Sequence, residues 1–203
     1  MDGGLIVALG MALAGYDPLV DQELAPKEAF SVGFGVQRLQ DDFGLALSVV
    51  SPSVADGHLA LRLEGGIGWA SDLRALPVDA EEQVAGAWSM YGHVRLLGVA
   101  ATRLGLASGR LYVALGPSLL VLDRQLSSER VSPGVVGVFG TEFFAADAYR
   151  AFPVSLFFEV GGTAHTASAD IENRIGEPEP SGTTVDRPIA TGLALSAGLR
   201  FYL

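Results

Sequence analysis

The sequence contains no cysteine, and Lys27 is the single lysine among its 13 basic residues. The absence of cysteine excludes disulfides and thiolate metal sites, and it fits an exported protein without deciding the compartment. The scarcity of lysine argues against several strands that face water. The chain also lacks a long apolar run, because the longest one, residues 3–16, is shorter than the roughly 20 residues of a membrane-spanning helix. Its hydrophobic residues must therefore be spread over many short segments.

What the sequence does contain is apolar and acidic. Its 203 residues fit one domain, and 49% hydrophobic residues with 18% charged residues and a mean hydropathy of +0.37 are too apolar for an ordinary soluble surface. The net charge is −10, and the acids concentrate at residues 41–42, 79–82 and 170–179. This balance argues against nucleic acid as a partner, because phosphate recognition uses clustered Lys and Arg.

The last segment, residues 187–203, alternates almost without interruption. Its odd positions are bulky and apolar from Ile189 to Leu203, while its even positions are small or polar and include Arg200 and Tyr202. An extended strand with this pattern has one bulky apolar face and one small, polar face. Such a strand suits a barrel with lipid outside and a crowded polar lumen inside.

The end of that segment, S-A-G-L-R-F-Y-L, resembles the C-terminal assembly signal of bacterial outer-membrane barrels. The matching positions are a polar residue, a glycine, an aromatic residue and a terminal hydrophobic residue: Ser196, Gly198, Phe201 and Leu203. The resemblance implies that the barrel assembly machinery is a partner and that the protein lies in the bacterial outer membrane.

Seven earlier segments alternate in the same way, so we predict an all-β fold: a closed antiparallel up-and-down transmembrane β-barrel of eight strands. The predicted strands are residues 29–39, 43–49, 59–69, 87–96, 110–121, 134–144, 153–163 and 187–203. The predicted lipid face carries Phe34, Leu45, Leu61, Val94, Val113, Phe158 and Leu195. Pro117 falls inside the fifth strand, where we expect a bulge because proline cannot donate to the ladder.

Residues 1–14 leave two interpretations open. The segment ends in Ala12-Leu13-Ala14, a small-x-small pattern typical of a signal-peptidase site, although the positive residues that usually precede it are missing. Its alternation also fits an additional strand, and the alternative fold is a barrel of ten strands that includes this segment. An even strand number is already reached without it, which favours a signal-like segment followed by a barrel domain over residues 15–203.

Loop lengths predict the orientation. The connections before the fourth, sixth and eighth strands are long and acidic, as expected on the outer side of a barrel whose C-terminus is periplasmic. Trp69 and Trp88 flank one of these loops, where an aromatic girdle would place them; the alternative is two core tryptophans of a soluble domain. The predicted girdle consists of Trp69, Trp88, Phe143, Phe201 and Tyr202.

Seven inward positions are ionisable: Arg62, Glu64, His93, Arg95, Glu142, Glu159 and Arg200. An eight-stranded barrel has a lumen just wide enough for side chains to fill it, so we expect these groups to pair with one another. The strand of Arg62 and Glu64 is next to the strand of His93 and Arg95, so these four residues can pair. The other three, Glu142, Glu159 and Arg200, lie on three consecutive strands and can pair as well. We interpret the set as a structural plug of ion pairs; a catalytic or proton-conducting role is the alternative.

Signals for catalysis are few. The three histidines are His58, His93 and His165, and His165 is the most interesting because Ser168 and Asp170 follow it at the outer rim. In an extended chain His165 faces away from both, so we predict no catalytic residues. No glycine-rich phosphate loop, paired-histidine metal spacing or cofactor motif is present, so we predict no metal and no cofactor.

Over residues 28–203 the architecture resembles the OmpA-like transmembrane barrel family, through its C-terminal signal, its eight strands and its loop asymmetry. The resemblance implies a structural or interaction role that uses the acidic outer loops, with outer-membrane lipid and an unknown envelope or extracellular protein as partners. A narrow, porin-like channel for small solutes is the first alternative, and a lipid-modifying outer-membrane enzyme is the second.

Overall fold

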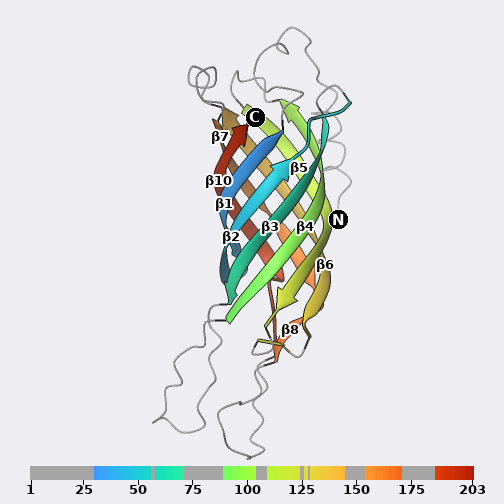
Figure 1. The fold of residues 1–203 in the computed structure, drawn as a ribbon, viewed down its shortest axis with the longest axis vertical. Helices are drawn as coiled ribbons and strands as arrows, with labels where there is room; N and C mark the ends of the chain where they lie inside the picture. Colours follow the sequence, from blue (N-terminus) through green and yellow to red (C-terminus); the bar gives the residue numbers. More distant parts are fainter. Residues whose placement is uncertain are drawn as a thin grey trace, which may run out of the picture.

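The computed structural model describes residues 30–55, 58–70, 89–103, 109–123, 126–127, 129–144, 154–170 and 186–203. Eight strands close into a barrel in the order β1-β10-β7-β6-β5-β4-β3-β2, and all neighbours are antiparallel, which confirms the predicted fold (Figure 1). The other two strands pair with each other outside the ring. The strands are β1 (Ser31–Leu39), β2 (Asp42–Val50), β3 (Leu59–Ala70), β4 (Ser89–Arg103), β5 (Gly109–Leu122), β6 (Val131–Phe144), β7 (Val154–His165), β8 (Ser168–Asp170), β9 (Asp186–Pro188) and β10 (Gly192–Tyr202).

The ring closes through its first and last strands. β1 pairs with β10 from Ser31–Tyr202 to Leu39–Ala194, so no additional strand lies between them. The alternative barrel of ten strands is therefore wrong. The signal-like residues 1–14 lie outside the described part of the chain, so their cleavage stays a prediction.

Most strand boundaries lie within three residues of those the alternation predicted, and two differ by five or more. β4 runs to Arg103 rather than stopping near residue 96, because its continuation has apolar residues on both faces and the difference between the faces disappears. β10 begins at Gly192 rather than at residue 187, because Ala190 and Gly192 have φ values of 49° and 124° and break the extended chain.

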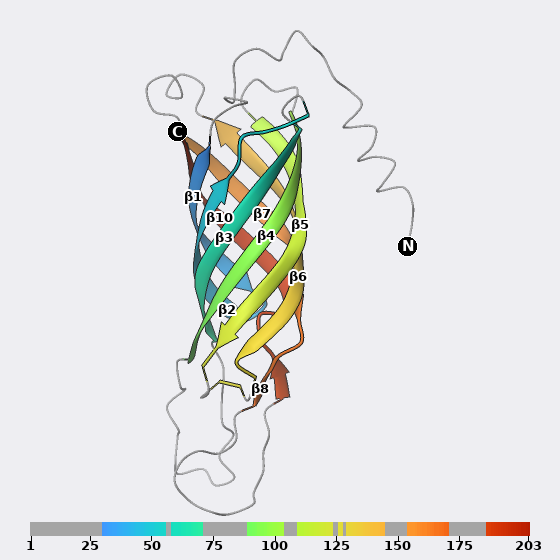
Figure 2. The ribbon, with the colours of Figure 1, turned by 45° about the vertical axis from the view of Figure 1, so that its right-hand side comes forward.

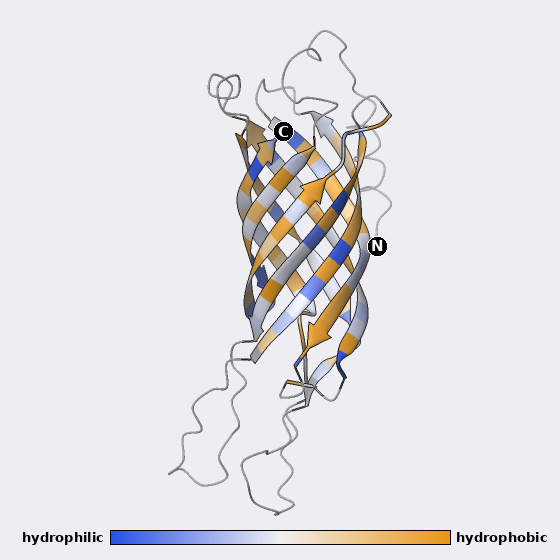
Figure 3. Ribbon diagram, in the orientation of Figure 1, coloured by the Kyte–Doolittle hydropathy of each residue, from blue (hydrophilic) through white to orange (hydrophobic). Residues whose placement is uncertain are grey.

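Hydrophobic and hydrophilic residues follow one another along the strands (Figure 3), and the burial of the side chains shows that the barrel is apolar outside and charged inside. All seven residues predicted for the outer face lie there; Leu61 is 58% exposed and Val94 48%, while Leu45 and Val113 are half-buried. In contrast, Glu142 is completely buried in the lumen and Arg200 is 2% exposed. A soluble barrel has the opposite polarity.

Large rings fill the lumen by lying over glycines of the adjacent strand. A Cβ at each of these glycines would overlap the ring, or come within 2.7 Å of it in the case of Phe157. The register pairs place each ring directly opposite its glycine. The pairs are Tyr91–Gly68, His93–Gly66, Tyr112–Gly140, Phe157–Gly198 and His165–Gly134.

β5 passes Pro117 without the bulge that we expected. The β4–β5 register is the same at Arg95–Ser118 and at Gly98–Leu115, on the two sides of the proline, and Pro117 itself pairs with Val135 of β6. The β4–β5 pairing is interrupted at Gly116 and Pro117, so the ladder passes the proline without an extra residue. A Cβ on Gly116 would overlap the Leu96 carbonyl oxygen of β4, so the two backbones lie close together there.

This close approach gives a stability prediction. Gly116→Ala should lower the free energy of unfolding by about 1–3 kcal/mol, because the new methyl group overlaps backbone rather than a flexible side chain. Gly98→Ala is the matched control on β4, since its Cβ would lie 3.8 Å from the nearest atom, the Leu115 carbonyl oxygen. Urea unfolding in detergent micelles measures both; equal unfolding energies would contradict the close contact.

Candidate functional site

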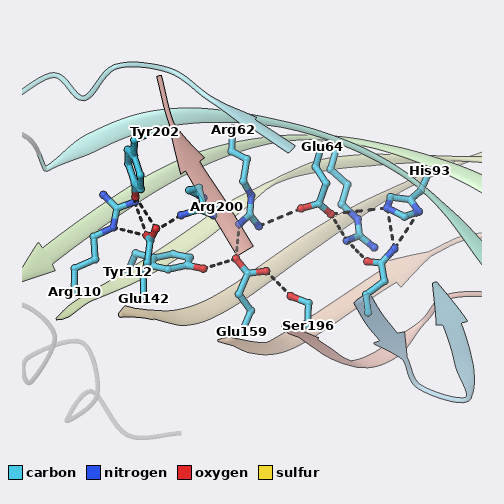
Figure 4. Close-up of polar contacts among 12 residues, drawn as sticks. Arg62, Glu64, His93, Arg110, Tyr112, Glu142, Glu159, Ser196, Arg200 and Tyr202 are labelled. Carbon is cyan, nitrogen blue, oxygen red and sulfur yellow. Dashed lines mark hydrogen bonds and ion pairs between the residues drawn. The ribbon is translucent and has the colours of Figure 1, made fainter. Parts of the chain in front are cut away.

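The lumen is the candidate site, and all seven ionisable residues predicted for it lie inside the barrel and are buried (Figure 4). β3 supplies Arg62 and Glu64, and β4 supplies His93 and Arg95. The other three come one each from β6, β7 and β10: Glu142, Glu159 and Arg200. None of these side chains is more than 8% exposed, so each needs a partner within the protein.

Arg62 lies at the centre of the network. Its Nη1 donates to Oε1 of Glu159 on β7, and its Nη2 lies 3.6 Å from Oε2 of Glu64 on its own strand. Glu64 in turn accepts a 2.7 Å hydrogen bond from Nη1 of Arg95, its register partner on β4. One arginine therefore joins opposite walls of the barrel.

Gln37 extends this group toward the β1–β2 end of the barrel. Its side-chain carbonyl accepts a 3.0 Å hydrogen bond from Arg95 Nη1, which fixes the orientation of the amide. The amide nitrogen then lies 3.0 Å from Nε2 of His93. Because an amide N–H can only donate, this ring nitrogen is an unprotonated acceptor.

Glu142 is the centre of a second group. Its Oε2 accepts hydrogen bonds from Arg200 Nη1 at 2.8 Å and from Arg110 Nε at 2.7 Å. Its Oε1 accepts from the Tyr202 hydroxyl at 2.5 Å and from the Ser155 hydroxyl. Two guanidinium groups and two hydroxyls thus converge on one buried carboxylate, which satisfies both of its oxygens.

Tyr112 connects the two groups. Its hydroxyl donates to Glu159 Oε1 at 2.7 Å, and the Arg200 guanidinium lies 5.7 Å from the centre of its ring. Ser196 completes the shell of Glu159 with a 2.6 Å hydrogen bond to Oε2. The described lumen therefore holds two groups of hydrogen bonds and ion pairs, drawn in Figure 4, that meet where the Arg200 guanidinium lies over the Tyr112 ring.

The described network is close to electroneutral. It contains four arginines and three glutamates. A further carboxylate, Asp42, is buried near the β1–β2 turn, where it accepts hydrogen bonds from the Tyr91 hydroxyl at 3.1 Å and the Ala190 amide at 3.3 Å. The ion pairs compensate the buried charges of the lumen, although Nε of Arg62, Arg95 and Arg200 and one Nη of Arg95 have no hydrogen-bond partner among the described residues.

The partners of Glu159 and Arg200 could not be read from strand order. The two residues lie on adjacent strands, but the register pairs Arg200 with Ser155, four residues before Glu159. At about 3.3 Å per residue, this places the two side chains more than 10 Å apart along the strand. Arg200 therefore reaches Glu142 and Glu159 reaches Arg62, each beyond the neighbouring strand.

Several network members were missed by reasoning from the sequence. Arg110 and Gln37 lie an even number of residues from inward positions of their own strands. The alternation therefore places both side chains in the lumen, where they could have been predicted as network members. Tyr202 was assigned to the aromatic girdle, but it lies inside the barrel with its hydroxyl on Glu142, as its parity with Arg200 requires. That assignment is wrong.

The other proposed girdle residues that the structure describes face outward. Trp69 is half-buried and stacks on Phe43, with ring centres 6.0 Å apart. Phe143 is 45% exposed and meets the edge of Phe158. Phe201 is half-exposed on the same face, and Trp88 lies outside the described residues.

A cluster of buried apolar side chains, here called the apolar cap, lies at the end of the barrel that carries the β1–β2 turn. β8 lies at this end, opposite the C-terminus (Figure 2). Ile189 and Leu126, from the connections between strands, are completely or almost completely buried in it. The cap consists of Leu39, Ala70, Tyr91, Leu120, Leu122, Leu126, Ala167, Ile189, Ala190 and Ala194.

His165 supports this cap through contacts with Ala190 and Ser118; the side chain of Asp170 lies outside the described part of the structure. Its Nδ1 lies 3.1 Å from the Ala190 carbonyl oxygen, and its Nε2 lies 2.9 Å from the Ser118 hydroxyl. Since a carbonyl only accepts, Nδ1 carries the proton, and in the neutral ring Nε2 accepts from Ser118. Ser118 is 4% exposed, so the pair fixes Ala190 and does not present a nucleophile to solvent.

Within the described residues, no cluster of three or more metal-ligating side chains is present. No helix in this part of the chain is long and apolar enough to cross a membrane. A scan against protein-family models gives no match, and a search of curated proteins gives none either.

Proposed function

We propose that the protein is a bacterial outer-membrane β-barrel with a filled, charge-paired lumen and a structural or interaction role, similar to the OmpA-like transmembrane barrels. The observation that carries this proposal is the inverted polarity of the barrel, with exposed apolar side chains around the ring and buried ion pairs inside. Soluble proteins rarely expose apolar patches of more than a few hundred Å².

A lipid bilayer would remove the free-energy cost of exposing this apolar surface to water. Lipid tails cover the apolar wall, and a closed ring leaves no unpaired backbone edge in the hydrocarbon. The ring strands have 9 to 15 residues. A tilted strand needs roughly 9–11 residues to cross a bilayer, so the ring strands are long enough. The same surface in water would favour aggregation.

The filling of the lumen favours a structural or interaction role over transport. Three glutamates and four arginines occupy the described interior, and the apolar cap lies across one mouth. With a periplasmic C-terminus, the cap and the β1–β2 turn face outward. The connections on that side are then the surface offered to an envelope or extracellular partner.

Reconstitution tests the proposal. We expect the refolded protein to insert into phospholipid vesicles, to run faster on a gel before boiling than after it, and to resist protease within the barrel. In planar bilayers it should give no steady conductance, because paired charges and the apolar cap occupy the described lumen. Failure to insert would contradict the membrane assignment, and a steady open conductance of the unmodified protein would favour the narrow channel.

A further inference from the structure

The outer wall of the barrel carries a single charge among the residues that the structure describes. Arg38 on β1 faces outward and is exposed. Every other outward position of the described ring strands is apolar, glycine, alanine, proline or threonine. An isolated cation on an apolar wall needs an anionic or aqueous neighbour, because charge is costly in hydrocarbon.

The hairpin fixes this guanidinium at one end of the wall. Arg38 Nε donates to the Gln40 carbonyl oxygen at 3.0 Å. Gln40 is itself tied to β10, since its backbone N–H donates to the Leu193 carbonyl at 2.6 Å and its side chain accepts from the Leu193 N–H at 3.1 Å. The Nη groups of Arg38 make no hydrogen bond to the described residues, so four N–H donors stay available.

The neighbours of Arg38 on the wall are aromatic and aliphatic. The register places Arg38 opposite Phe43 on β2 and Leu195 on β10, and it places Phe43 opposite Trp69. Stacked aromatic rings beside a cation are typical of the level where lipid headgroups meet hydrocarbon. Phe34, further along β1 toward the middle of the wall, is 47% exposed and offers the surface that an acyl chain would cover.

We propose that Arg38 binds the phosphate of a membrane lipid whose acyl chains lie along the outer faces of β1 and β2. The planar guanidinium fork matches the geometry of a phosphate, and its long aliphatic stem lets it reach the headgroup level. The inference rests on the proposed membrane function and adds the ligand and its position. The lipid belongs to the leaflet at the β1–β2 end, which is the outer leaflet if the C-terminus is periplasmic.

Native mass spectrometry of the full chain tests the site. The refolded barrel in maltoside micelles is titrated with phosphatidylglycerol, and the lipid retained per barrel is counted. Arg38→Gln should raise the apparent dissociation constant about fivefold, the effect of one charge-assisted contact at an exposed site. Arg38→Lys should recover part of the affinity, because it keeps the charge but loses the fork.

Arg130→Gln is the matched control, since Arg130 is an exposed arginine at the same end of the barrel but outside the strands. It should leave the dissociation constant unchanged. A glycolipid without phosphate should bind equally to the unmodified protein and to Arg38→Gln, and millimolar inorganic phosphate should not displace phosphatidylglycerol. Equal binding by all variants, equal weakening by Arg130→Gln, or displacement by inorganic phosphate would each overturn the proposal.

The two proposals can fail separately. The lipid titration is done in micelles on protein whose unboiled gel mobility shows a folded barrel, so it does not depend on insertion into vesicles. A barrel that inserts but does not distinguish Arg38→Gln would retain the membrane function and lose this site. A folded barrel that never inserts would contradict the membrane function itself.

Discussion

Glu142→Gln is expected to lower the free energy of unfolding by about 3–5 kcal/mol, the cost of removing one partner from a buried ion pair. The carboxylate of Glu142 compensates Arg110 and Arg200 together, and it also accepts the hydroxyls of Ser155 and Tyr202. Glutamine keeps the shape but leaves two guanidiniums without a counter-charge. Urea unfolding in detergent micelles, followed by tryptophan fluorescence and by gel mobility, measures the loss.

A mutant cycle separates pairing from burial. Arg200→Gln should also be destabilising, and combining it with Glu142→Gln should cost less than the sum of the two, with a coupling of about 0.5–3 kcal/mol. The cycle of Arg200 with Glu159 should give weaker coupling, because Glu159 pairs with Arg62. Glu129→Gln, at an exposed site between β5 and β6, should be nearly neutral. A Glu142 variant as stable as this control would contradict the network.

Deletion of residues 201–203 is expected to abolish barrel assembly in cells while synthesis continues. The deleted end carries the aromatic and hydrophobic positions that resemble the assembly signal, and it also closes the ring. Phe201 pairs with Val32, Tyr202 donates to Glu142, and the Leu203 N–H donates to the Phe30 carbonyl. Surface labelling and heat-modifiable mobility of the truncated protein measure assembly; normal values for both would contradict the prediction.

Single substitutions separate recognition from closure. Phe201→Ala removes the aromatic position of the signal but leaves Tyr202 in the lumen network, so it should reduce assembly in cells more than refolding in detergent. Phe143→Ala is the matched control, since Phe143 is also an outward aromatic residue on the wall. It should leave assembly in cells unchanged. Equal defects in the two variants would show that lost apolar surface, rather than recognition, explains the effect.

The alternation of side chains was sufficient to predict a strand and its inward face wherever the two faces of the strand differ. Ser31–Leu39 and Val154–His165 have mostly small or polar residues on one face and mostly apolar residues on the other, so strand and orientation follow from a period of two. The extension of β4 has Leu97 and Val99 inside and Leu96 outside, so its pattern carries no such contrast. The sequence therefore predicts which residues face inward better than where a strand ends.

The contacts of the lumen could not be predicted in the same way, because they depend on register and on reach across the barrel. Arg62 and Glu159 are 97 residues apart and lie on β3 and β7, which are not neighbours. Glu64 and Arg95 lie on adjacent strands, and there strand order was a sufficient guide. The role of His165 in the cap depends on a bend at Ala190 for which neither periodicity nor composition gives a signal.

The rings that lie over glycines have a consequence for how such a sequence can evolve. Tyr112 fills the space that the missing side chain of Gly140 leaves, and Tyr91 does the same at Gly68. A larger residue at either glycine collides with the ring, and a smaller residue at either tyrosine opens a void. We therefore expect each pair to be inherited as a unit. Among sequences related to this one, the two members of a pair should change together. Covariation between residues 112 and 140 and between 68 and 91 would then identify these residues as register partners of adjacent strands.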